Sequence, residues 1–359
     1  MISGGLTLYF LGKVFLNDKR LPKILFSWVK YVLNMKLTRS LIVSAVLLGI
    51  VLVSSSWGFL VHKTTHQLAV YQLPVPLQSF FYTHIDNVVS NSVRPDQRRN
   101  SDPTEATKHF IDLEMFGTDA ANKMPLEWDK AVAMFTKDSL IKYGYVPYHI
   151  IYMQAKLTEA FKQKNKDSIL FYAADLGHYI GDAHVPLHTT INYDGQLTGQ
   201  KGMHSLWEST VPDIEIAQYN LYTSHKASYL SDSKTAIWTA VRKGYNMVGF
   251  MLETERTVSK NFTEADKYEL KMWYGKETKA YTLPFAKAYG IALKNTVNER
   301  LIESANLIAD FWYTAWVDAG KPDLSAFENT SLAQDLQKEL GAYQQNSLVK
   351  DGFLRALKR

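Results

Sequence analysis

Residues 165–184, NKDSILFYAADLGHYIGDAH, constrain the fold more than any other segment of this chain. On a helix that turns by roughly 100° per residue, their apolar and polar side chains separate onto opposite faces. One face packs into a core, and the other presents a histidine and two carboxylates. The apolar face holds Ile169, Ala173, Leu176 and Ile180, and the polar face holds Phe171, Asp175, His178 and Asp182.

The remainder of the chain beyond residue 57 has the same helical character. Apolar residues recur at spacings of three and four, and alternating runs typical of strands are few. Residues 282–320 predict one long helix with Pro284 near its start and Gly320 at its end. Its apolar stripe comprises Ile291, Val297, Leu301, Ala305, Ile308, Trp312 and Ala315. Other helices are predicted over 60–72, 77–91, 127–142, 148–163, 204–218, 232–258 and 329–344.

The stretches 92–126 and 185–203 are rich in Pro, Gly, Asn and Asp and are predicted to be loops. Neither an internal repeat nor a linker interrupts the pattern. We therefore predict an all-α fold, with a single multi-helix domain over residues 57–345 and a C-terminal tail over 346–359. We expect a monomer, and nothing in the sequence implies a protein partner.

Composition excludes several kinds of site. The 359 residues contain no cysteine, which excludes disulfides, thiolate metal sites and cysteine nucleophiles. Any metal site must use histidine, carboxylate and main-chain groups. The net charge of +5 arises from residues 1–56, which carry seven basic side chains and one acidic side chain. Of the 40 basic and 35 acidic residues in the whole chain, 33 basic and 34 acidic residues therefore lie in the body, residues 57–359. The body therefore has no bulk positive charge for binding polyanions, although local patches remain open.

Residues 35–56, MKLTRSLIVSAVLLGIVLVSSS, follow the three-part plan of a secretory signal peptide. Lys36 and Arg39 precede an apolar stretch, and Ser54 and Ser56 occupy positions −3 and −1 of a cleavage site before Trp57. The apolar stretch, residues 41–53, is shorter than the ~20 residues that a membrane span needs.

We therefore predict export across the cytoplasmic membrane, to a periplasm or the exterior, with a mature chain that begins at Trp57. The alternative is a signal anchor that stays attached. Because a complete signal peptide begins at Met35, residues 1–34 are predicted to be a misassigned start or a short prefix.

Five polar residues between 178 and 208 form a spaced set. His178 precedes Asp182 by four residues, His188 follows six later, and His204 precedes Glu208 by four. Imidazole and carboxylate are zinc ligands, usually four to an ion, so this set suffices for more than one zinc. The alternative is that these are ordinary solvated residues; one such pair is weak evidence, and the complete set is much stronger.

The segment HYIGDAHVPLH followed by MHSLWE resembles the signature of a zinc-enzyme superfamily. Its members include bacterial zinc-dependent phospholipases C and fungal single-strand-specific nucleases that also act as 3′-nucleotidases. The motifs match from residue 57 to about 210. Family members begin their mature chain at a tryptophan whose amino group and carbonyl bind zinc, and WGFLVH, with Trp57 and His62, resembles that start. An α-amino pKa of about 8 makes the neutral amine accessible to a metal.

This resemblance implies three Zn²⁺ ions in a cleft between helices. Asp96, His109, His178 and Asp182 would hold the first; His188, His204 and Glu208 the second; Trp57 and His62 the third, with Asp182 bridging the first and third. Such a cluster activates water for attack on phosphorus and offsets charge on phosphate oxygens. Asp96 would also orient the nucleophile. Asp175 is expected to hold the imidazole of His178, and His184 to support a ligand; His66, His84, His149 and His225 match no ligand position.

Local matches favour a nuclease over a phospholipase. In the resemblance, Phe110 and Asp112 of HFID take the places of an aromatic residue that stacks on a base and an aspartate that reads the base edge. Arg99 takes the place of a cation that contacts phosphate, for which a planar guanidinium is suited. Phe110 packed in a core and Asp112 as a loop or capping residue are the alternatives. The phospholipases place an acid and two aromatic residues around choline, where this chain has Leu60, Gln97 and Ala106.

Other features resemble the phospholipases. The last ligand is Glu208 where the nucleases have aspartate, the His188–His204 loop is near the phospholipase length, and a histidine–phenylalanine pair with an aspartate occurs in both groups. We predict a zinc-dependent nuclease or 3′-nucleotidase acting on single-stranded nucleic acid. The alternatives are a zinc-dependent phospholipase C and a secreted zinc-binding protein without catalysis.

Overall fold

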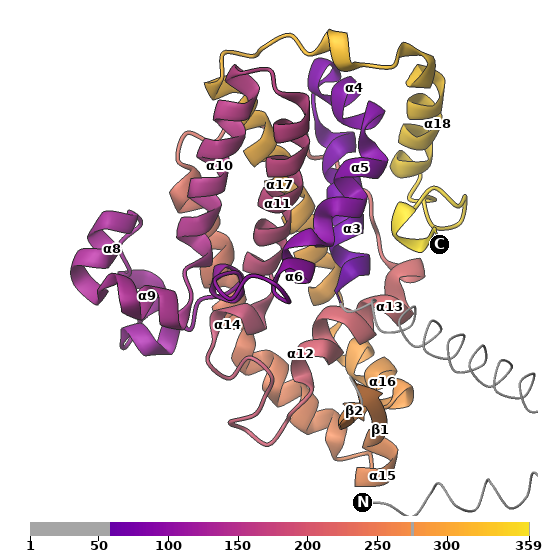
Figure 1. Ribbon diagram of the computed structural model, residues 1–359. Coiled ribbons are helices and arrows are strands. Elements are labelled where there is room, and N and C mark those ends of the chain that lie inside the picture. The colour runs from indigo at the N-terminus through magenta and orange to yellow at the C-terminus, as the bar shows by residue number, and fades with distance from the viewer. Residues whose placement is uncertain (1–57, 274–275, 359) are drawn as a thin grey trace, which may run out of the picture. The chain divides into compact units, whose positions relative to one another are not determined.

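Helix α11 (Lys166–Ala183) lies at the centre of a group of long helices (Figure 1). The computed structural model describes residues 58–273 and 276–358, all within one unit that spans residues 56–359. α11 contacts α3 (Phe59–Gln72), α10 (Val146–Lys162), α14 (Ser233–Ser259) and α17 (Thr296–Asp318). It begins where the Asn165 side chain accepts a hydrogen bond from Ser168 N, as a good N-cap does. Every residue from Ala173 to Ala183 is buried, so its polar face points into the protein.

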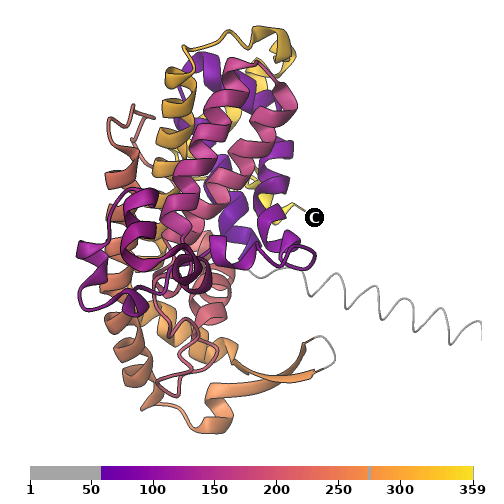
Figure 2. The ribbon, with the colours of Figure 1, turned by 60° about the vertical axis from the view of Figure 1, so that its left-hand side comes forward.

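The all-α prediction is confirmed, and the shorter elements complete one helical domain (Figures 1 and 2). The predicted loop 92–126 contains short helical turns, as does 185–203 at Pro186–Thr189. The other helices are α4 (Val75–Thr83), α5 (Ile85–Ser90), α6 (Arg94–Arg98), α7 (Ala120–Lys123), α8 (Trp128–Phe135), α9 (Lys137–Tyr143), α12 (Met203–Ser205), α13 (Val211–Glu215), α15 (Glu264–Lys267), α16 (Leu283–Leu293) and α18 (Ala333–Gln344).

Three predicted helices are in fact divided. The segment 77–91 forms α4 and α5, with His84 between them. The segment 282–320 forms α16 and α17, because Lys294 adopts a positive φ of 56° between them. This break turns α16 away from the stripe of α17, so Ile291 is 67% exposed while Val297 and Leu301 are buried. The segment 127–142 is divided at Thr136, whose side chain accepts a hydrogen bond from Ser139 N and caps α9. Such hydrogen bonds from a side chain to the local backbone compete with continuation of the helix, and they do not alter the spacing of apolar residues in the sequence.

An antiparallel hairpin was not predicted. Strands β1 (Tyr268–Trp273) and β2 (Lys276–Tyr281) pair with Tyr268 opposite Tyr281, and the hairpin projects from the helices (Figure 2). Its base is held because Tyr281 donates a hydrogen bond to Glu255 Oε1 at 3.0 Å on α14. Leu270 and Met272 on β1 are largely exposed.

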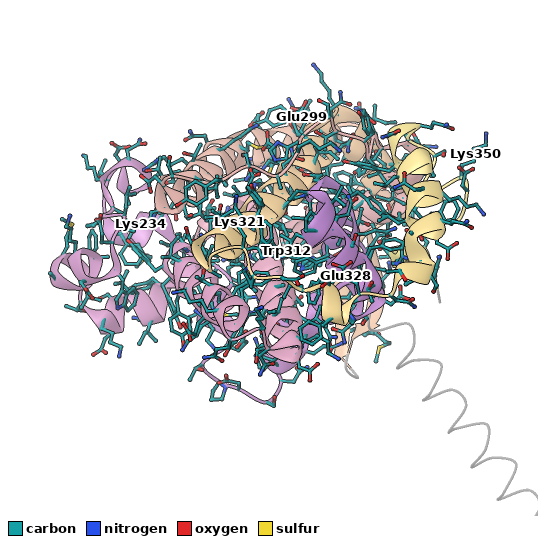
Figure 3. All side chains as sticks on the ribbon, turned by 90° about the horizontal axis from the view of Figure 1, so that it is seen from above. Lys234, Glu299, Trp312, Lys321, Glu328 and Lys350 are labelled. Atoms are coloured by element: carbon teal, nitrogen blue, oxygen red, sulfur yellow. The ribbon has the colours of Figure 1, made fainter. Side chains whose placement is uncertain are left out.

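The core forms where α17 meets α3, α4 and α11. Trp312 lies among the packed helices (Figure 3), is fully buried, stacks on Phe81 at 4.6 Å and donates its indole N–H to Ala173 O. Residues 346–358 pack against the outer side of α3, with Leu348 and Leu354 buried. Within the described part of the chain, no helix combines the length and hydropathy needed to cross a membrane. The predicted signal peptide and prefix lie outside the described residues.

Candidate metal centre

The structure brings together the predicted metal ligands that it describes. Their ring nitrogens and carboxylate oxygens form three neighbouring groups, each with its ligand atoms within 4.8 Å of one another. They come from α3, α6, the turn that ends at His109, α11, the turn Pro186–Thr189 and the helical segment that begins at α12. Trp57, the ninth predicted ligand, lies outside the described residues. The three groups are Asp96, His109 and His178; His62, His178 and Asp182; and His188, His204 and Glu208.

Asp182 lies beside histidines of all three groups. Its Oδ2 lies 2.8 Å from His109 Nδ1 and 3.3 Å from His178 Nε2. Its Oδ1 lies 3.5 Å from His62 Nε2 and 3.9 Å from His188 Nδ1. Asp182 is 1% exposed, so its negative charge acts on four imidazoles in a poorly solvated interior. This central position agrees with the bridging role that the family resemblance implies.

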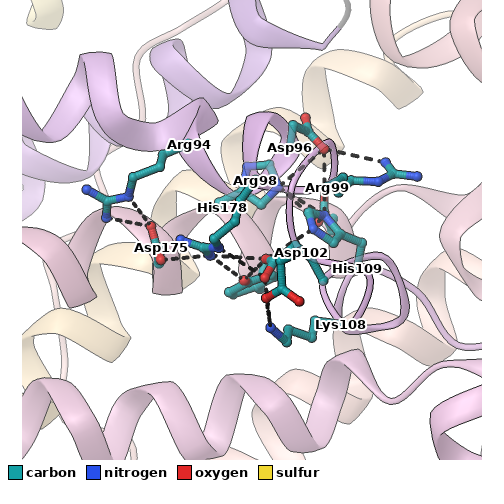
Figure 4. Close-up of polar contacts among 12 residues, drawn as sticks. Arg94, Asp96, Arg98, Arg99, Asp102, Lys108, His109, Asp175 and His178 are labelled. Carbon is teal, nitrogen blue, oxygen red and sulfur yellow. Dashed lines mark hydrogen bonds and ion pairs between the residues drawn. The ribbon is translucent and has the colours of Figure 1, made fainter.

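Asp96 completes the first group from the more open side of the centre. Its Oδ1 lies 3.7 Å from His109 Nδ1 and 3.8 Å from His178 Nε2 (Figure 4). The Asp96 side chain is 24% exposed, whereas those of His109 and His178 are almost fully buried. Asp96 is thus a carboxylate that touches both the ligand cluster and the solvent from which a substrate arrives.

Two glycines on α11 let α3 approach closely enough for His62 to join the centre. A Cβ on Gly181 would come within 2.9 Å of the His62 ring, and one on Gly177 within 2.3 Å of the ring of His66. The rings of His62 and His178 stack with their centroids 4.1 Å apart. The four-residue spacing of the two glycines therefore matches that of the two histidines. This G-x-x-x-G pattern is a signal that the sequence analysis missed.

The third group depends on a π-helical turn, Leu206–Thr210, that follows α12. It places Glu208 Oε2 2.7 Å from His204 Nε2 and 3.5 Å from His188 Nε2. Single π-turns within helices are often found at functional sites. The predicted helix 204–218 thus has the expected position but a wider first turn.

The hydrogen bonds on the outer side of the imidazoles test whether a cation fits between them. His188 Nδ1 lies 2.7 Å from His109 O, and His204 Nδ1 lies 3.2 Å from Tyr193 O. A carbonyl only accepts hydrogen bonds, so each neutral ring carries its proton on Nδ1. The two Nε2 atoms then face each other at 3.2 Å as lone pairs, an arrangement that a metal ion or added protons must stabilise. His178 follows the same rule, with Nδ1 2.8 Å from Ser92 O. The donor set fits zinc, which accepts imidazole and carboxylate ligands.

The charges of these groups are strongly coupled. Burial opposes protonation of His109, but Asp182, Glu105 and Asp96 together raise its pKa to about 9. Burial also opposes protonation of His178, yet Asp182 and Asp96 raise its pKa. Conversely, burial disfavours the charged form of Asp182, but the neighbouring histidines hold its pKa well below the ordinary value. Without a metal, protons therefore occupy the positions that a metal would take.

This competition predicts a pH-dependent metal affinity. His109 must lose its proton to bind a metal, and its pKa is about 9 in the metal-free protein, so affinity should rise from pH 6 towards pH 9 and fall on acidification. Titration against a chromophoric chelator at several pH values measures this. His66 should release no proton over this range, because burial lowers its pKa to about 3. An affinity that is constant between pH 6 and 9 would contradict the coupling.

Phe110 and Asp112, the two predicted substrate-contacting residues next to His109, are both half-buried. Phe110 is half-buried and does not belong to the hydrophobic core, which argues against plain core packing. Gly144 adopts a φ of 86° and leaves room for Phe110, whose ring a Cβ there would meet at 2.6 Å. Asp112 is also half-buried, and burial with the nearby Glu114 raises its pKa to about 6. Arg99 lies 3.5 Å from Asp96 with its side chain 48% exposed, free to meet an anion.

The expectation that Asp175 holds the His178 imidazole is wrong. Asp175 accepts hydrogen bonds from Arg94 and Arg98 at 2.6 and 3.0 Å (Figure 4), and Ser92 O takes the His178 bond instead. The arginines reach Asp175 because α6 crosses α11 at this point. His184 bonds to the carbonyl of Ile180.

The first described residue already touches this centre. Gly58 N donates a hydrogen bond to Ser209 Oγ at 2.7 Å, and a Cβ on Gly58 would lie 2.9 Å from Glu208 Oε1. Gly58 has a φ of 70°, a conformation that glycine adopts without strain. Neither the contact with Ser209 nor the need for glycine at position 58 was predicted from the sequence.

Comparison with known protein families agrees with this geometry. A family model described as S1/P1 Nuclease matches residues 57–311, a range that begins at the predicted mature terminus and includes all nine predicted ligands. Comparison with curated proteins gave no match. The matched range covers most of the chain, and within it histidines and carboxylates converge in three groups that could hold metal ions. The chain belongs to the S1/P1 nuclease family, whose members are nuclease-type phosphodiesterases.

Proposed function

We propose that this protein is a zinc-dependent nuclease and 3′-nucleotidase that hydrolyses phosphodiester bonds of single-stranded nucleic acid, endonucleolytic cleavage included, with three Zn²⁺ ions. The proposed zinc dependence is supported by the Nε2 atoms of His188 and His204, which lie 3.2 Å apart with their lone pairs facing each other. Family membership carries the nuclease part. Bound zinc supplies an activated water at neutral pH and offsets charge on phosphate oxygens.

The protein's own residues have distinct roles in this proposal. Asp96, partly exposed beside His109 and His178, accepts the proton of the attacking water and orients it. Arg99 meets a phosphate oxygen, since its guanidinium is exposed and lies next to Asp96. Phe110 stacks on the base, and Asp112 accepts a hydrogen bond from the base edge when ionised.

The mature chain is proposed to begin at Trp57, after export across the cytoplasmic membrane and removal of residues 35–56. The contact of Gly58 with Ser209 and Glu208 supports this assignment. We propose that the free amino group of Trp57, the residue before Gly58, lies near the Glu208 carboxylate in the mature chain. We also propose that the protein works as a monomer.

Four substrates assayed in parallel test the proposal. Residues 57–359 with a native Trp57 terminus, loaded with zinc, should hydrolyse single-stranded DNA, RNA and 3′-nucleotides and release little headgroup from phosphatidylcholine. Elemental analysis of the same sample should find three zinc ions per chain. Headgroup release without nucleic-acid cleavage would favour the phospholipase C alternative, which Glu208 supports. Zinc binding with neither activity would favour a non-catalytic zinc-binding protein.

The choline pocket gives one reason to rank the phospholipase second. The positions that would hold its acid and aromatic residues are Leu60, Gln97 and Ala106, and Gln97 is exposed. None has the π-face that attracts a quaternary ammonium group.

Phe110→Ala tests the stacking role. Base–aromatic stacking contributes about 1–3 kcal/mol per base, so kcat/KM for single-stranded DNA should fall by about 5- to 150-fold, chiefly through KM, at unchanged zinc content. Phe250→Ala, which removes an exposed phenylalanine on α14, is the matched control and should leave kcat/KM unaltered. Equal effects of the two substitutions would contradict a specific contact with the base.

A further inference from the structure

Glu105 is a buried carboxylate on the side of His109 that faces away from the metal ligands. It is fully buried and precedes His109 by four residues. Its Oε1 lies 3.5 Å from His109 Nε2, a buried atom that forms no hydrogen bond with the described residues. A charge buried in the interior must be compensated by partners, so the groups around Glu105 decide how its carboxylate is held.

Three donors hold this carboxylate in one orientation. Arg98 Nε and Lys108 Nζ donate to Oε2 at 3.0 and 2.7 Å. Arg98 Nη2 also reaches Oε1, at 3.0 Å, and Tyr179 donates its hydroxyl to the same oxygen. Arg98 and Lys108 offset the negative charge of Glu105. Their contacts with Oε2 hold the carboxylate so that Oε1 faces the His109 ring.

His109 differs from the other histidines of the centre in the nitrogen that it presents. His178, His188 and His204 direct Nε2 inward and bond through Nδ1 to carbonyl oxygens. His109 directs Nδ1 inward, 2.8 Å from Asp182 Oδ2 and 3.1 Å from His178 Nε2. To bind a metal through Nδ1, the ring must carry its proton on Nε2, and Glu105 is the carboxylate beside that atom.

We propose that Glu105 is a positioning residue that holds His109 in the Nε2–H tautomer and so makes Nδ1 available to the metal. This inference rests on the proposed function. An ionised carboxylate can only accept hydrogen bonds, so it favours a proton on Nε2 and increases the basicity of Nδ1. Carboxylates that bond to the outer nitrogen of a metal-bound histidine act in this way.

Glu105→Gln is a sharp test because the surrounding donors decide how the new amide lies. Oε2 accepts from two obligate donors, Arg98 Nε and Lys108 Nζ, whereas Oε1 accepts from one, Arg98 Nη2, and from the Tyr179 hydroxyl, which can turn to accept instead. The amide oxygen should therefore take the place of Oε2. The NH₂ group then faces His109 Nε2 and favours the tautomer with a proton on Nδ1. The substitution therefore changes side-chain shape little but presents a donor where His109 needs an acceptor.

The readouts are zinc affinity, measured by chelator competition, and ¹H–¹⁵N spectra of zinc-loaded protein labelled at histidine. Removing such an outer partner typically lowers metal affinity by about 10–100-fold, and we expect this loss at one of the bound ions. The wild-type spectrum should show a hydrogen-bonded Nε2–H of His109 that shifts upfield in the variant. Glu339→Gln, which alters a buried carboxylate paired with Arg355, should change neither.

Tyr179→Phe provides a second variant in case Glu105→Gln folds poorly. It removes the hydroxyl donor to Oε1 but keeps the carboxylate, so a smaller affinity loss and a smaller Nε2–H shift are expected. Zinc affinity and spectra equal to wild type in both variants would overturn the positioning role. A wild-type protein that binds no zinc would overturn the proposed function itself, so the two failures are distinguishable.

Discussion

Asp182→Asn should lower the rate of single-stranded DNA hydrolysis by at least about 10³-fold, the largest loss expected from a single conservative substitution in this protein. Asp182 is 1% exposed and lies within 3.9 Å of four imidazoles. Asparagine keeps the shape but removes the charge and directs an NH₂ group at ring nitrogens that must accept a metal. Steady-state rates with zinc in excess and elemental analysis of dialysed protein measure the two consequences.

The same substitution should destabilise the metal-free protein. Removing one partner of a buried ion pair costs about 3–5 kcal/mol in the free energy of unfolding, and Asp182 is the counter-ion of protonated His109 and His178. Asp310→Asn is the matched control, because Asp310 is a buried carboxylate that accepts hydrogen bonds from His225 and from Ser228 N. It should lose stability but keep its zinc and its activity. Full activity and metal content in Asp182→Asn would show that the ligand assignment is wrong.

Retaining one residue before Trp57 should remove one zinc ion per chain and reduce hydrolysis by about 10²–10³-fold. An added residue converts the terminal amine into a peptide nitrogen, whose lone pair is delocalised over the amide and cannot bind a metal. The close contacts of Gly58 with Ser209 and Glu208 hold the first described residue against the candidate metal centre. Elemental analysis and single-stranded DNA hydrolysis of proteins that begin at Ser56 and at Trp57 provide the comparison.

A protein with a removable N-terminal extension before Trp57 provides the internal control for this experiment. Cleavage that exposes Trp57 should restore both the third ion and the activity in the same preparation, which excludes misfolding as the cause of the loss. If the protein that begins at Ser56 already holds three ions and hydrolyses DNA at the full rate, the terminal amine is not a ligand and export need not precede activity.

Helix periodicity predicted the fold class and the central helix because apolar spacing directly reports which side of a helix is buried. It did not predict the breaks at Thr136 and Lys294, where a local cap or a positive φ ends a helix without interrupting the apolar pattern. It also missed the hairpin β1–β2, whose exposed strands carry no buried alternating face.

The two pairs His178–Asp182 and His204–Glu208 of the candidate ligand set could be predicted from spacing, because a histidine and an acid four residues apart on a helix share one face. That spacing requires no knowledge of the rest of the chain. The positions of Asp96, His62 and His109 entered through the family resemblance, and the structure places all three at the centre.

Only the tertiary structure decided which group supports which ligand. Asp175 and Glu105 both occupy sequence positions suited to holding a neighbouring histidine, yet Asp175 pairs with Arg94 and Arg98 while Glu105 faces His109. Such choices depend on contacts between α6 and α11, which are about 80 residues apart in the chain. Sequence spacing determines which side chains share a face of one helix. The pairing of buried charges depends instead on which helices pack together, because a charge in a poorly solvated interior must be neutralised by a nearby partner.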